Sequence, residues 1–318
     1  MNALRIDDPG PLTTVQDAGR FGYQDRGVPV CGAMDPAALI LGNLLVGNKP
    51  GEAALEILFG GFRATFLNST VFAVTGADPE VRHNGERVAP WVSLTAAPGD
   101  TVAVDAGDFG ARHYLCVKGG VDVPLVLGSK STYVRGGFGG HEGRAFRKGD
   151  MVATGVPVDT ALDCIPRRLR PAYDPSPMVR VVLGPQAERI TEQGLQYLLS
   201  SPYTVTQRAD RMGIMLDGPK LTHTRGADIL SDGIALGSIQ VPGEGLPFIL
   251  MADRATTGGY VKAATVVTRD IPLVAQLLPG AVLHFCAVTI EEAREAHLKW
   301  AFLVKRFVER QRAQKKTE

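Results

Sequence analysis

The sequence predicts a mostly β protein, built of barrels or sandwiches with a few short helices. The chain has 37 glycines and 21 prolines among its 318 residues, more than the usual share of both, so turns are numerous. Short apolar segments recur between these turns, at a spacing that favours barrels or sandwiches over alternating β-α units. Few segments have helical periodicity.

Turn signals mark several of the expected strands. Asn84 and Gly85 lie at the centre of segment 81–88, and both tolerate the positive φ angles of a tight hairpin turn. Three other segments repeat a Gly-containing turn followed by an apolar strand, and they begin at Pro98, Lys148 and Pro279. We therefore predict a hairpin over 81–88 and a strand after each of the three turns.

Two helices are expected before residue 200. Asp35 caps the first, Pro36 occupies its first position, and Gly47 ends it. The second is predicted from about residue 186 to residue 199, where Gly194 weakens it.

A third helix and a proline-rich segment define the organisation of the chain. Thr289 and Glu292 fit a capping box, and apolar residues follow at helical spacing. Segment 165–178 has four prolines and three arginines, a composition typical of a boundary. We predict an N-terminal lobe over 1–165, a C-terminal lobe over 179–289, and a C-terminal helix and tail over 290–318, with crossing between lobes allowed.

Charge and hydropathy exclude several classes of protein. The 34 basic and 33 acidic residues nearly balance, which argues against general nucleic-acid binding. No apolar run reaches about 18 residues, and the N-terminus lacks a signal-peptide pattern, so we expect a cytoplasmic protein without a membrane span. The four cysteines are far apart in the sequence and are expected to be buried, reduced thiols.

Common cofactor motifs do not fit the sequence. Segment 128–132 resembles the end of a phosphate-binding loop, but its Gly and Lys are not adjacent. The glycines of 136–143 miss the spacing of a dinucleotide fingerprint. The histidines do not cluster by spacing, so no metal site is expected.

Four clusters of polar residues beside glycine remain as candidate ligand sites. The first, 13–20, holds Gln16, Asp17 and Arg20, and arginine binds carboxylate or phosphate groups. A capped turn with a surface ion pair is the alternative for this cluster. The second contains Asp35, which is either a helix N-cap alone or also part of an anion site at the helix N-terminus.

The third cluster, 128–144, places Ser131, Thr132, Arg135 and Arg144 among six glycines. Successive backbone N–H groups in such a loop form anion-binding concavities, and a solvated loop is the alternative.

The fourth cluster, 231–260, has an apolar strand that leads into a polar glycine turn. It contains Gln240, Asp253, Thr256, Thr257 and Tyr260. The carboxylate of Asp253 suits a general base or a residue that orients one. The alternative is a β-turn whose Asp and Thr side chains bond to their own backbone.

At these four clusters the sequence resembles the biotin-dependent carboxyltransferase family, which includes KipA, the C component of 5-oxoprolinase and proteins called allophanate hydrolase subunit 2. The matching stretches are TTVQDAGRFGYQDRGVPVCGAMDPAA, LGNLLVGN, GSKSTYVRGGFGGHEGRAFRKGD, DRMGIMLDGP, SDGIALGSIQVPGEGLPFILMAD and TTGGY. They occur in family order from about residue 9 to about residue 289. The sequence departs from the family pattern at Met215, Ala255 and Val261, where Arg, Gln and Pro are usual.

The resemblance implies two cyclophilin-like β-barrel lobes. It also implies a leading function, the C component of an ATP-dependent 5-oxoprolinase, which converts 5-oxo-L-proline to L-glutamate with a KipI-type B component and a LamB/YcsF-type A component. ATP would be bound in the complex. One alternative is a carboxyltransferase subunit that moves CO₂ to a urea or amide nitrogen from carboxybiotin supplied by another protein. The other is a KipA-like regulatory protein that binds a KipI-type kinase inhibitor.

The substrates implied by the resemblance share an amide or urea group, which needs hydrogen-bond donors and acceptors and a stabiliser of developing charge. We therefore predict Asp253, Asp17 and Arg20 as catalytic, with Asp253 as the acid/base group. The predicted substrate-binding residues are Gln16, Asp35, Ser131, Thr132, Arg135, Arg144, Gln240, Thr256, Thr257 and Tyr260.

Overall fold

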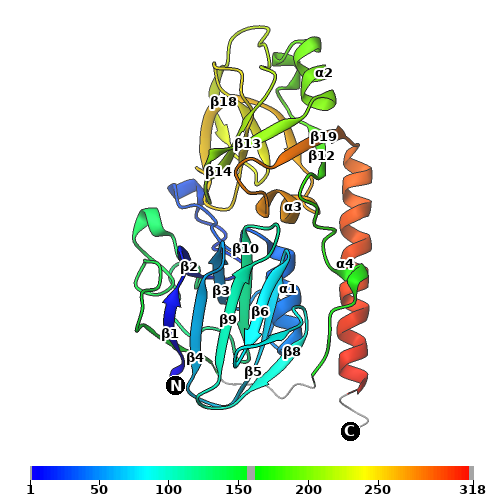
Figure 1. Ribbon diagram of the computed structural model, residues 1–318. Helices are drawn as coiled ribbons and strands as arrows, with labels where there is room; N and C mark the ends of the chain where they lie inside the picture. The colour runs from blue at the N-terminus through cyan, green and yellow to red at the C-terminus, as the bar shows by residue number, and fades with distance from the viewer. Residues whose placement is uncertain (1, 156–161, 315–318) are drawn as a thin grey trace. The chain divides into compact units, whose positions relative to one another are not determined.

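The computed structural model describes residues 2–155 and 162–314, and these group into two compact units (Figure 1). Unit 1 comprises Met1–Arg20, Cys31–Pro171 and Trp300–Glu318, and unit 2 comprises Phe21–Val30 and Ala172–Lys299. The chain therefore makes a short excursion into unit 2 after Arg20, enters it again within the proline-rich segment, and returns to unit 1 in the C-terminal helix.

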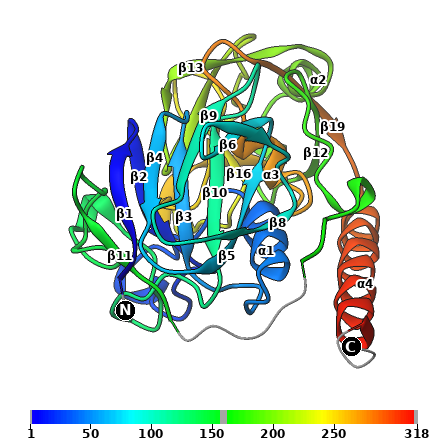
Figure 2. The same cartoon turned by 60° about the horizontal axis from the view of Figure 1, so that its bottom comes forward.

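Two antiparallel sheets build unit 1 (Figure 2). The strands are β1 (Asn2–Pro9), β2 (Leu12–Gln16), β3 (Ala54–Leu58), β4 (Phe62–Phe66), β5 (Thr70–Gly76), β6 (Pro79–His83), β7 (Glu86–Val88), β8 (Ser93–Ala96), β9 (Thr101–Ala106), β10 (Arg112–Val117) and β11 (Met151–Ala153). One sheet has the order β11-β1-β4-β9-β6-β7 and the other β2-β3-β10-β5-β8. Both contribute to one core, in which Ile6, Phe62 and Leu115 are completely buried.

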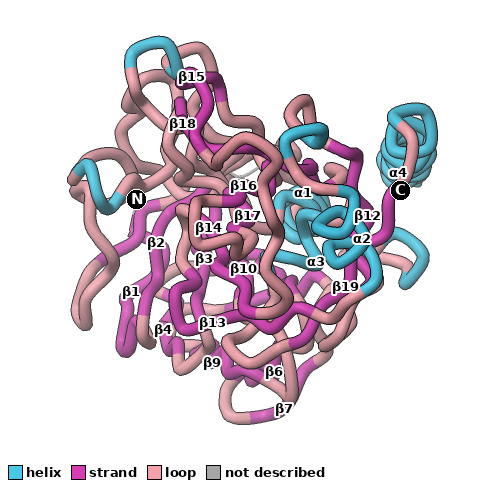
Figure 3. The backbone as a smooth tube through the Cα atoms, turned by 90° about the horizontal axis from the view of Figure 1, so that it is seen from above, coloured by secondary structure: helices cyan, strands magenta, loops and turns pink. Residues whose placement is uncertain are grey.

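A single sheet builds unit 2 (Figure 3). Its strands are β12 (Met178–Leu183), β13 (Tyr203–Ala209), β14 (Gly213–Asp217), β15 (Asp228–Gly233), β16 (Ser238–Val241), β17 (Phe248–Leu250), β18 (Thr257–Val266) and β19 (Val282–Ala287). The order is β12-β19-β13-β14-β17-β16-β18-β15, and β12 also pairs with β18. Because β12 pairs with both β19 and β18, the strands from β12 to β18 in this order form a closed ring. Strand β15 pairs with β18 and lies outside the ring. The predicted mostly β fold is confirmed.

The helices are few, as the sequence predicts. They are α1 (Pro36–Leu45), α2 (Glu192–Ser200), α3 (Ile271–Ala275) and α4 (Ile290–Gln314), with 3₁₀ turns η1 (Gln24–Arg26), η2 (Val134–Gly136), η3 (Arg167–Leu169) and η4 (Ala187–Arg189). Asp35 caps α1 by accepting a hydrogen bond from the Ala38 N–H at 2.9 Å. This confirms the predicted start, and the helix ends at Leu45, two residues before Gly47. In the described part of the chain, no helix is long and apolar enough to cross a membrane.

The start of α2 differs from the prediction. The Thr191 side chain accepts a hydrogen bond from the Gly194 N–H at 3.1 Å, so the helix begins at Glu192. The residues before this cap form the separate turn η4 instead of the first turn of the helix.

The long helix α4, red in Figure 1, begins at the predicted capping box. The Glu292 N–H donates to Thr289 Oγ1 at 3.1 Å, and the Thr289 N–H donates to Glu292 Oε2 at 2.8 Å. Farther along, Trp300 Nε1 donates to the Leu169 carbonyl at 3.0 Å, which attaches the helix to unit 1.

The strand predictions are confirmed, whereas one expectation about cysteine is wrong. Strands β6 and β7 pair around Asn84 and Gly85, whose φ angles are 52° and 86°. Strands β9, β11 and β19 follow the three turns that the sequence marks. Cys31 and Cys116 are buried, but Cys286 on β19 is only half-buried, and Cys164 is exposed because it lies on the irregular segment after β11. All four cysteines are free thiols.

Candidate functional site

The Asp17 carboxylate organises the first candidate site, which lies in unit 1 at the end of β2. Its Oδ1 accepts hydrogen bonds from the Gly19 N–H at 2.7 Å, the Ser129 hydroxyl at 2.7 Å and the Ser131 hydroxyl at 2.5 Å. Its Oδ2 accepts one from the Lys130 N–H at 2.6 Å. Asp17 therefore fixes the third cluster of the sequence onto the first, and its acceptor capacity is largely used within the protein.

The loop that resembles a phosphate-binding loop has its backbone donors occupied. The N–H groups of 129–132 donate in turn to Val126 O, Asp17 Oδ2, Ser129 Oγ and Val15 O. The Thr132 hydroxyl donates to Val15 O at 3.0 Å, and the Lys130 ammonium donates to Glu52 at 3.0 Å. These four N–H groups are thus not available as a cradle for phosphate oxygens.

Arg20 and Gln16 stand out in this site because their hydrogen-bonding capacity is not filled. Arg20 is 1% exposed, its Nη2 donates to the Ser131 carbonyl, and its guanidinium lies 5.0 Å from the centroid of the Phe138 ring. Its Nε and Nη1 are buried with no partner among the described residues, and so is Oε1 of Gln16. Buried polar atoms are seldom left unpaired, so these three atoms call for an ordered water or a ligand as their partner.

The residues around Asp35 continue the same region of unit 1. The Ala33 N–H donates to the Asp17 carbonyl at 3.0 Å. The Asp35 N–H donates to the Tyr114 hydroxyl at 2.8 Å, which itself donates to Glu56 Oε2 at 2.6 Å. Burial, the Glu56 carboxylate and the Asp35 carboxylate raise the pKa of Tyr114, so this network holds a neutral phenol.

Arg144 and Arg135 belong to the glycine-rich loop of unit 1. Arg144 donates to Asp150 Oδ2 at 2.6 Å and to Glu142 Oε2 at 2.8 Å. The hydrogen bond from Arg144 is the largest cause that lowers the pKa of Asp150 to about 2. The Arg144 side chain thus bonds to residues of its own loop, whereas Arg135 lies exposed on η2.

A buried ion pair organises the second candidate site, which lies in unit 2. Arg211 donates to Asp253 through Nε to Oδ2 at 3.0 Å and through Nη2 to Oδ1 at 2.8 Å. Each residue is 8% exposed. The Asp253 N–H also donates to the Arg211 carbonyl at 2.8 Å, so backbone and side chain together fix the carboxylate in the turn between β17 and β18.

Gln240 and Lys262 lie opposite each other on β16 and β18 of the same unit. Gln240 Nε2 is buried with no partner among the described residues, and a Cβ at Gly258 would lie 2.6 Å from it. The Lys262 side chain is 5% exposed, and its ammonium donates to Asp232 at 3.3 Å. The missing side chain at Gly258 therefore leaves room beside the buried amide of Gln240, and the buried ammonium of Lys262 lies across the strand pair from Gln240.

The structure divides the predicted site residues between the two units. Unit 1 holds Gln16, Asp17, Arg20, Asp35, Ser131, Thr132, Arg135 and Arg144, whereas unit 2 holds Gln240, Asp253, Thr256, Thr257 and Tyr260. Of the last three, Thr256 is half-buried, and Thr257 and Tyr260 are exposed at the start of β18.

Sequence reasoning missed Glu56, Tyr114, Arg211 and Lys262. For Glu56 and Lys262 the available signal was one charged residue inside an apolar strand, which is costly unless the charge has a partner or a task. For Arg211 the signal was its place in the DRMG stretch.

The departures from the family pattern lie apart from one another along the chain: Met215 is half-buried in β14, Ala255 is exposed before β18, and Val261 is buried in β18.

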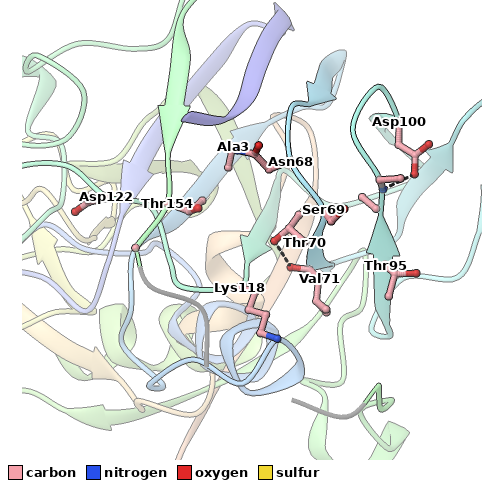
Figure 4. A pocket seen from close by; sticks show the side chains of 13 residues that line it. Ala3, Asn68, Ser69, Thr70, Val71, Thr95, Asp100, Lys118, Asp122 and Thr154 are labelled. Atoms are coloured by element: carbon pink, nitrogen blue, oxygen red, sulfur yellow. Dashed lines mark hydrogen bonds between the residues drawn. The ribbon is translucent and has the colours of Figure 1, made fainter. Parts of the chain in front are cut away.

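A separate cavity of about 940 Å³ lies in unit 1, at the ends of β5 and β8 and after β10 (Figure 4). Its polar lining includes Asn68, Thr95, Asp100, Lys118 and Asp122. Asp100, labelled in Figure 4, accepts a hydrogen bond through Oδ2 from the Ala97 N–H at 2.8 Å. Its described lining includes none of the predicted site residues.

The sequence of the chain matches a known carboxyltransferase family. Residues 26–287 match the family described as carboxyltransferase domain, subdomain A and B, and the chain belongs to this family. It is 36% identical over 295 residues to the C component of 5-oxoprolinase from Escherichia coli (strain K12), covering 92% of this chain and 94% of that protein. It is 35% identical over 299 residues to the C component of 5-oxoprolinase from Haemophilus influenzae, covering 93% of this chain and 94% of that protein.

A solved structure shares this fold over almost the whole chain. The crystal structure of the K. lactis urea amidolyase superposes with a TM-score of 0.90 at 30% sequence identity. The match covers 96% of this chain but 20% of the urea amidolyase chain, so this chain corresponds to one part of that larger protein.

Proposed function

We propose that this chain is the C component of an ATP-dependent 5-oxoprolinase, which converts 5-oxo-L-proline to L-glutamate. The observation that carries this proposal is the identity of 36% to the Escherichia coli C component over 92% of this chain and 94% of that protein. The match to the Saccharomyces cerevisiae urea amidolyase is weaker, at 29% identity, and covers 17% of that protein.

The site residues supply the groups that opening a lactam requires. A lactam presents a carbonyl acceptor and an N–H donor, which buried polar groups such as the Gln240 amide of unit 2 complement. The Asp253 carboxylate is the proton acceptor or donor at the amide, and Arg211 orients it through two hydrogen bonds. Asp17 acts on the reaction indirectly, since it positions the loop that surrounds Arg20.

The chain works within a complex in this proposal, with a KipI-type B component and a LamB/YcsF-type A component. ATP is a substrate of the whole complex and activates the amide for opening. Because the N–H groups of 129–132 are occupied, we place the ATP phosphates outside this loop.

Reconstitution tests the proposal. The three components are co-expressed and purified, and ADP release is measured with and without 5-oxo-L-proline. We expect ADP release that depends on 5-oxo-L-proline and on this chain. Equal ADP release with and without 5-oxo-L-proline contradicts the proposal.

The second candidate function is transfer of CO₂ from carboxybiotin on another protein to a urea or amide nitrogen. The TM-score of 0.90 to the K. lactis urea amidolyase favours it. Mass spectrometry of proteins that co-purify with this chain separates the two candidates. A biotinylated partner supports carboxyl transfer, whereas a 5-oxoprolinase brings none.

A further inference from the structure

We propose that Arg20 and Gln16 form a buried site that binds the carboxylate group of a small acid substrate. The proposed function identifies this acid as 5-oxoproline, and the inference rests on that function for the identity of the acid. The site itself is argued from the burial, contacts and charge of the two side chains.

The first step is the unbalanced charge of Arg20. Its side chain is fully buried, and its hydrogen bond goes to a neutral carbonyl, that of Ser131. Two other arginines of this chain, Arg211 and Arg180, are instead paired through two hydrogen bonds each with Asp253 and Asp270. Burying a guanidinium without a counterion is unfavourable, so an anion that joins Arg20 binds favourably.

The second step is that Arg20 is held in one position. Its Nη2 is bonded to Ser131, and its guanidinium lies over the Phe138 ring. A Cβ at Gly139, where φ is +74°, would lie 2.8 Å from Nη2, so glycine permits this close approach. Nε and Nη1 remain as donors on a guanidinium that loses little further freedom when a ligand binds.

The third step adds an acceptor to the two donors. Gln16 Nε2 donates to Thr14 Oγ1 at 3.0 Å and to the Thr132 carbonyl at 3.2 Å, which leaves Oε1 unpaired. Arg20 and Gln16 therefore bond to consecutive residues, Ser131 and Thr132, and lie at the same loop. A carboxylate next to an N–H group, as in 5-oxoproline, satisfies both side chains.

The fourth step favours a carboxylate over a phosphate. The Asp17 carboxylate accepts from the hydroxyl of Ser131, whose carbonyl accepts from Arg20, so Ser131 links the two side chains and the charge of Arg20 still lacks a directly bonded anion. The Lys130 ammonium of the same loop is bonded to Glu52. A singly charged carboxylate matches the single positive charge of Arg20, whereas a doubly charged phosphate exceeds it.

Calorimetry on the full chain tests the site with four probes. These are 5-oxo-L-proline, 2-pyrrolidinone (the same lactam without the carboxylate), acetate and inorganic phosphate. The wild-type chain is compared with Arg20→Met, with Arg20→Lys, which keeps the charge without the guanidinium donors, and with Arg180→Met as the control whose guanidinium is paired. The free energy of unfolding is measured without ligand for each variant.

We expect Arg20→Met to lower the affinity for 5-oxo-L-proline at least tenfold and to leave that for 2-pyrrolidinone unchanged. Without ligand, Arg20→Met should be at least as stable as the wild type, because it removes an unbalanced buried charge. Arg180→Met should lose stability, because it leaves Asp270 without its partner, and should keep the affinity for 5-oxo-L-proline. Arg20→Lys should bind more weakly than the wild type.

The outcomes separate this inference from the proposed function. Arg20-dependent binding of acetate without binding of 5-oxo-L-proline supports the site and contradicts the proposed substrate. Equal affinity of wild type and Arg20→Met for 5-oxo-L-proline overturns the site but not the function. Failure of every carboxylate to bind the wild type, or tighter binding of phosphate than of any carboxylate, also overturns the site.

Discussion

At the residue scale, His113 shows that a polar group without a partner also occurs away from the candidate sites. It lies fully buried on β10 of unit 1, and neither ring nitrogen has a partner among the described residues. Burial lowers its pKa to about 4, although the carboxylates of Asp78 and Asp105 oppose this shift. The folded protein therefore holds a neutral imidazole at neutral pH.

This burial predicts a pH dependence of stability. Between about pH 6.5 and about pH 4 the unfolded chain binds a proton at residue 113 that the folded protein does not bind. Stability is therefore lost as the pH falls through this window, by up to about 3 kcal/mol. In His113→Leu, urea unfolding at several pH values should show that this loss is absent.

The control for this prediction is His284→Gln, because His284 lies on β19 and is half-exposed. It should keep the pH dependence of the wild type. If His113→Leu retains the full loss of stability between pH 6.5 and 4, residue 113 is not its source.

The sequence showed which polar residues were unusual but not what each one does. Asp17 and Arg20 are three positions apart in one motif. The Asp17 carboxylate accepts four hydrogen bonds within the protein, whereas Arg20 has two nitrogens without a partner among the described residues. The difference arises because Ser129, Lys130 and Ser131 bond to Asp17 from more than a hundred residues away. No local pattern encodes such contacts, whereas the local N-cap of Asp35 was predicted correctly.

At the element scale, β18 contains a backbone donor at Val261, where the resemblance to the family leads us to expect proline. The Val261 N–H donates to the Ala227 carbonyl at 2.9 Å, and Val261 pairs with Val241 of β16. Proline, which the resemblance leads us to expect at this position, has no N–H. The strand in this chain therefore gains a hydrogen bond that joins it to the segment before β15.

Val261→Pro should destabilise the protein by about 1–3 kcal/mol, because it removes this hydrogen bond and leaves a carbonyl without its partner. Urea unfolding measures the change. Ala255→Gln is the control, since it restores the other family residue at an exposed position and should change stability by less than about 0.5 kcal/mol. An unchanged unfolding midpoint for Val261→Pro contradicts the prediction.

Elements bounded by local signals were predictable, whereas their pairing was not. The caps of α1 and α4 and the turn at Asn84 and Gly85 depend on residues within four positions of one another. The ring in unit 2 instead depends on β12, which pairs parallel with β19 and antiparallel with β18. These partners follow β12 by many elements, and strand periodicity does not specify which strands become neighbours.

At the scale of the whole molecule, the predicted residues fall into two sets because the chain divides between two units. The excursion of Phe21–Val30 into unit 2 begins directly after Arg20. A linear division of the sequence could not show this crossing. Asp253 in unit 2 therefore needs a test that separates a role in the reaction from a role in holding its own unit together.

A double-mutant cycle on Asp253 and Arg211 makes this separation. Breaking a buried ion pair from one side leaves an unpaired charge and costs about 3–5 kcal/mol, while removing both charges restores much of the stability. We expect Asp253→Asn and Arg211→Met each to be destabilised, and the double variant to recover stability. If Asp253 moves a proton in the reaction, ADP release in the reconstituted complex should fall about a hundredfold or more in Asp253→Asn and should not recover in the double variant. Activity that recovers together with stability would show that the pair is structural and that the acid/base group lies elsewhere.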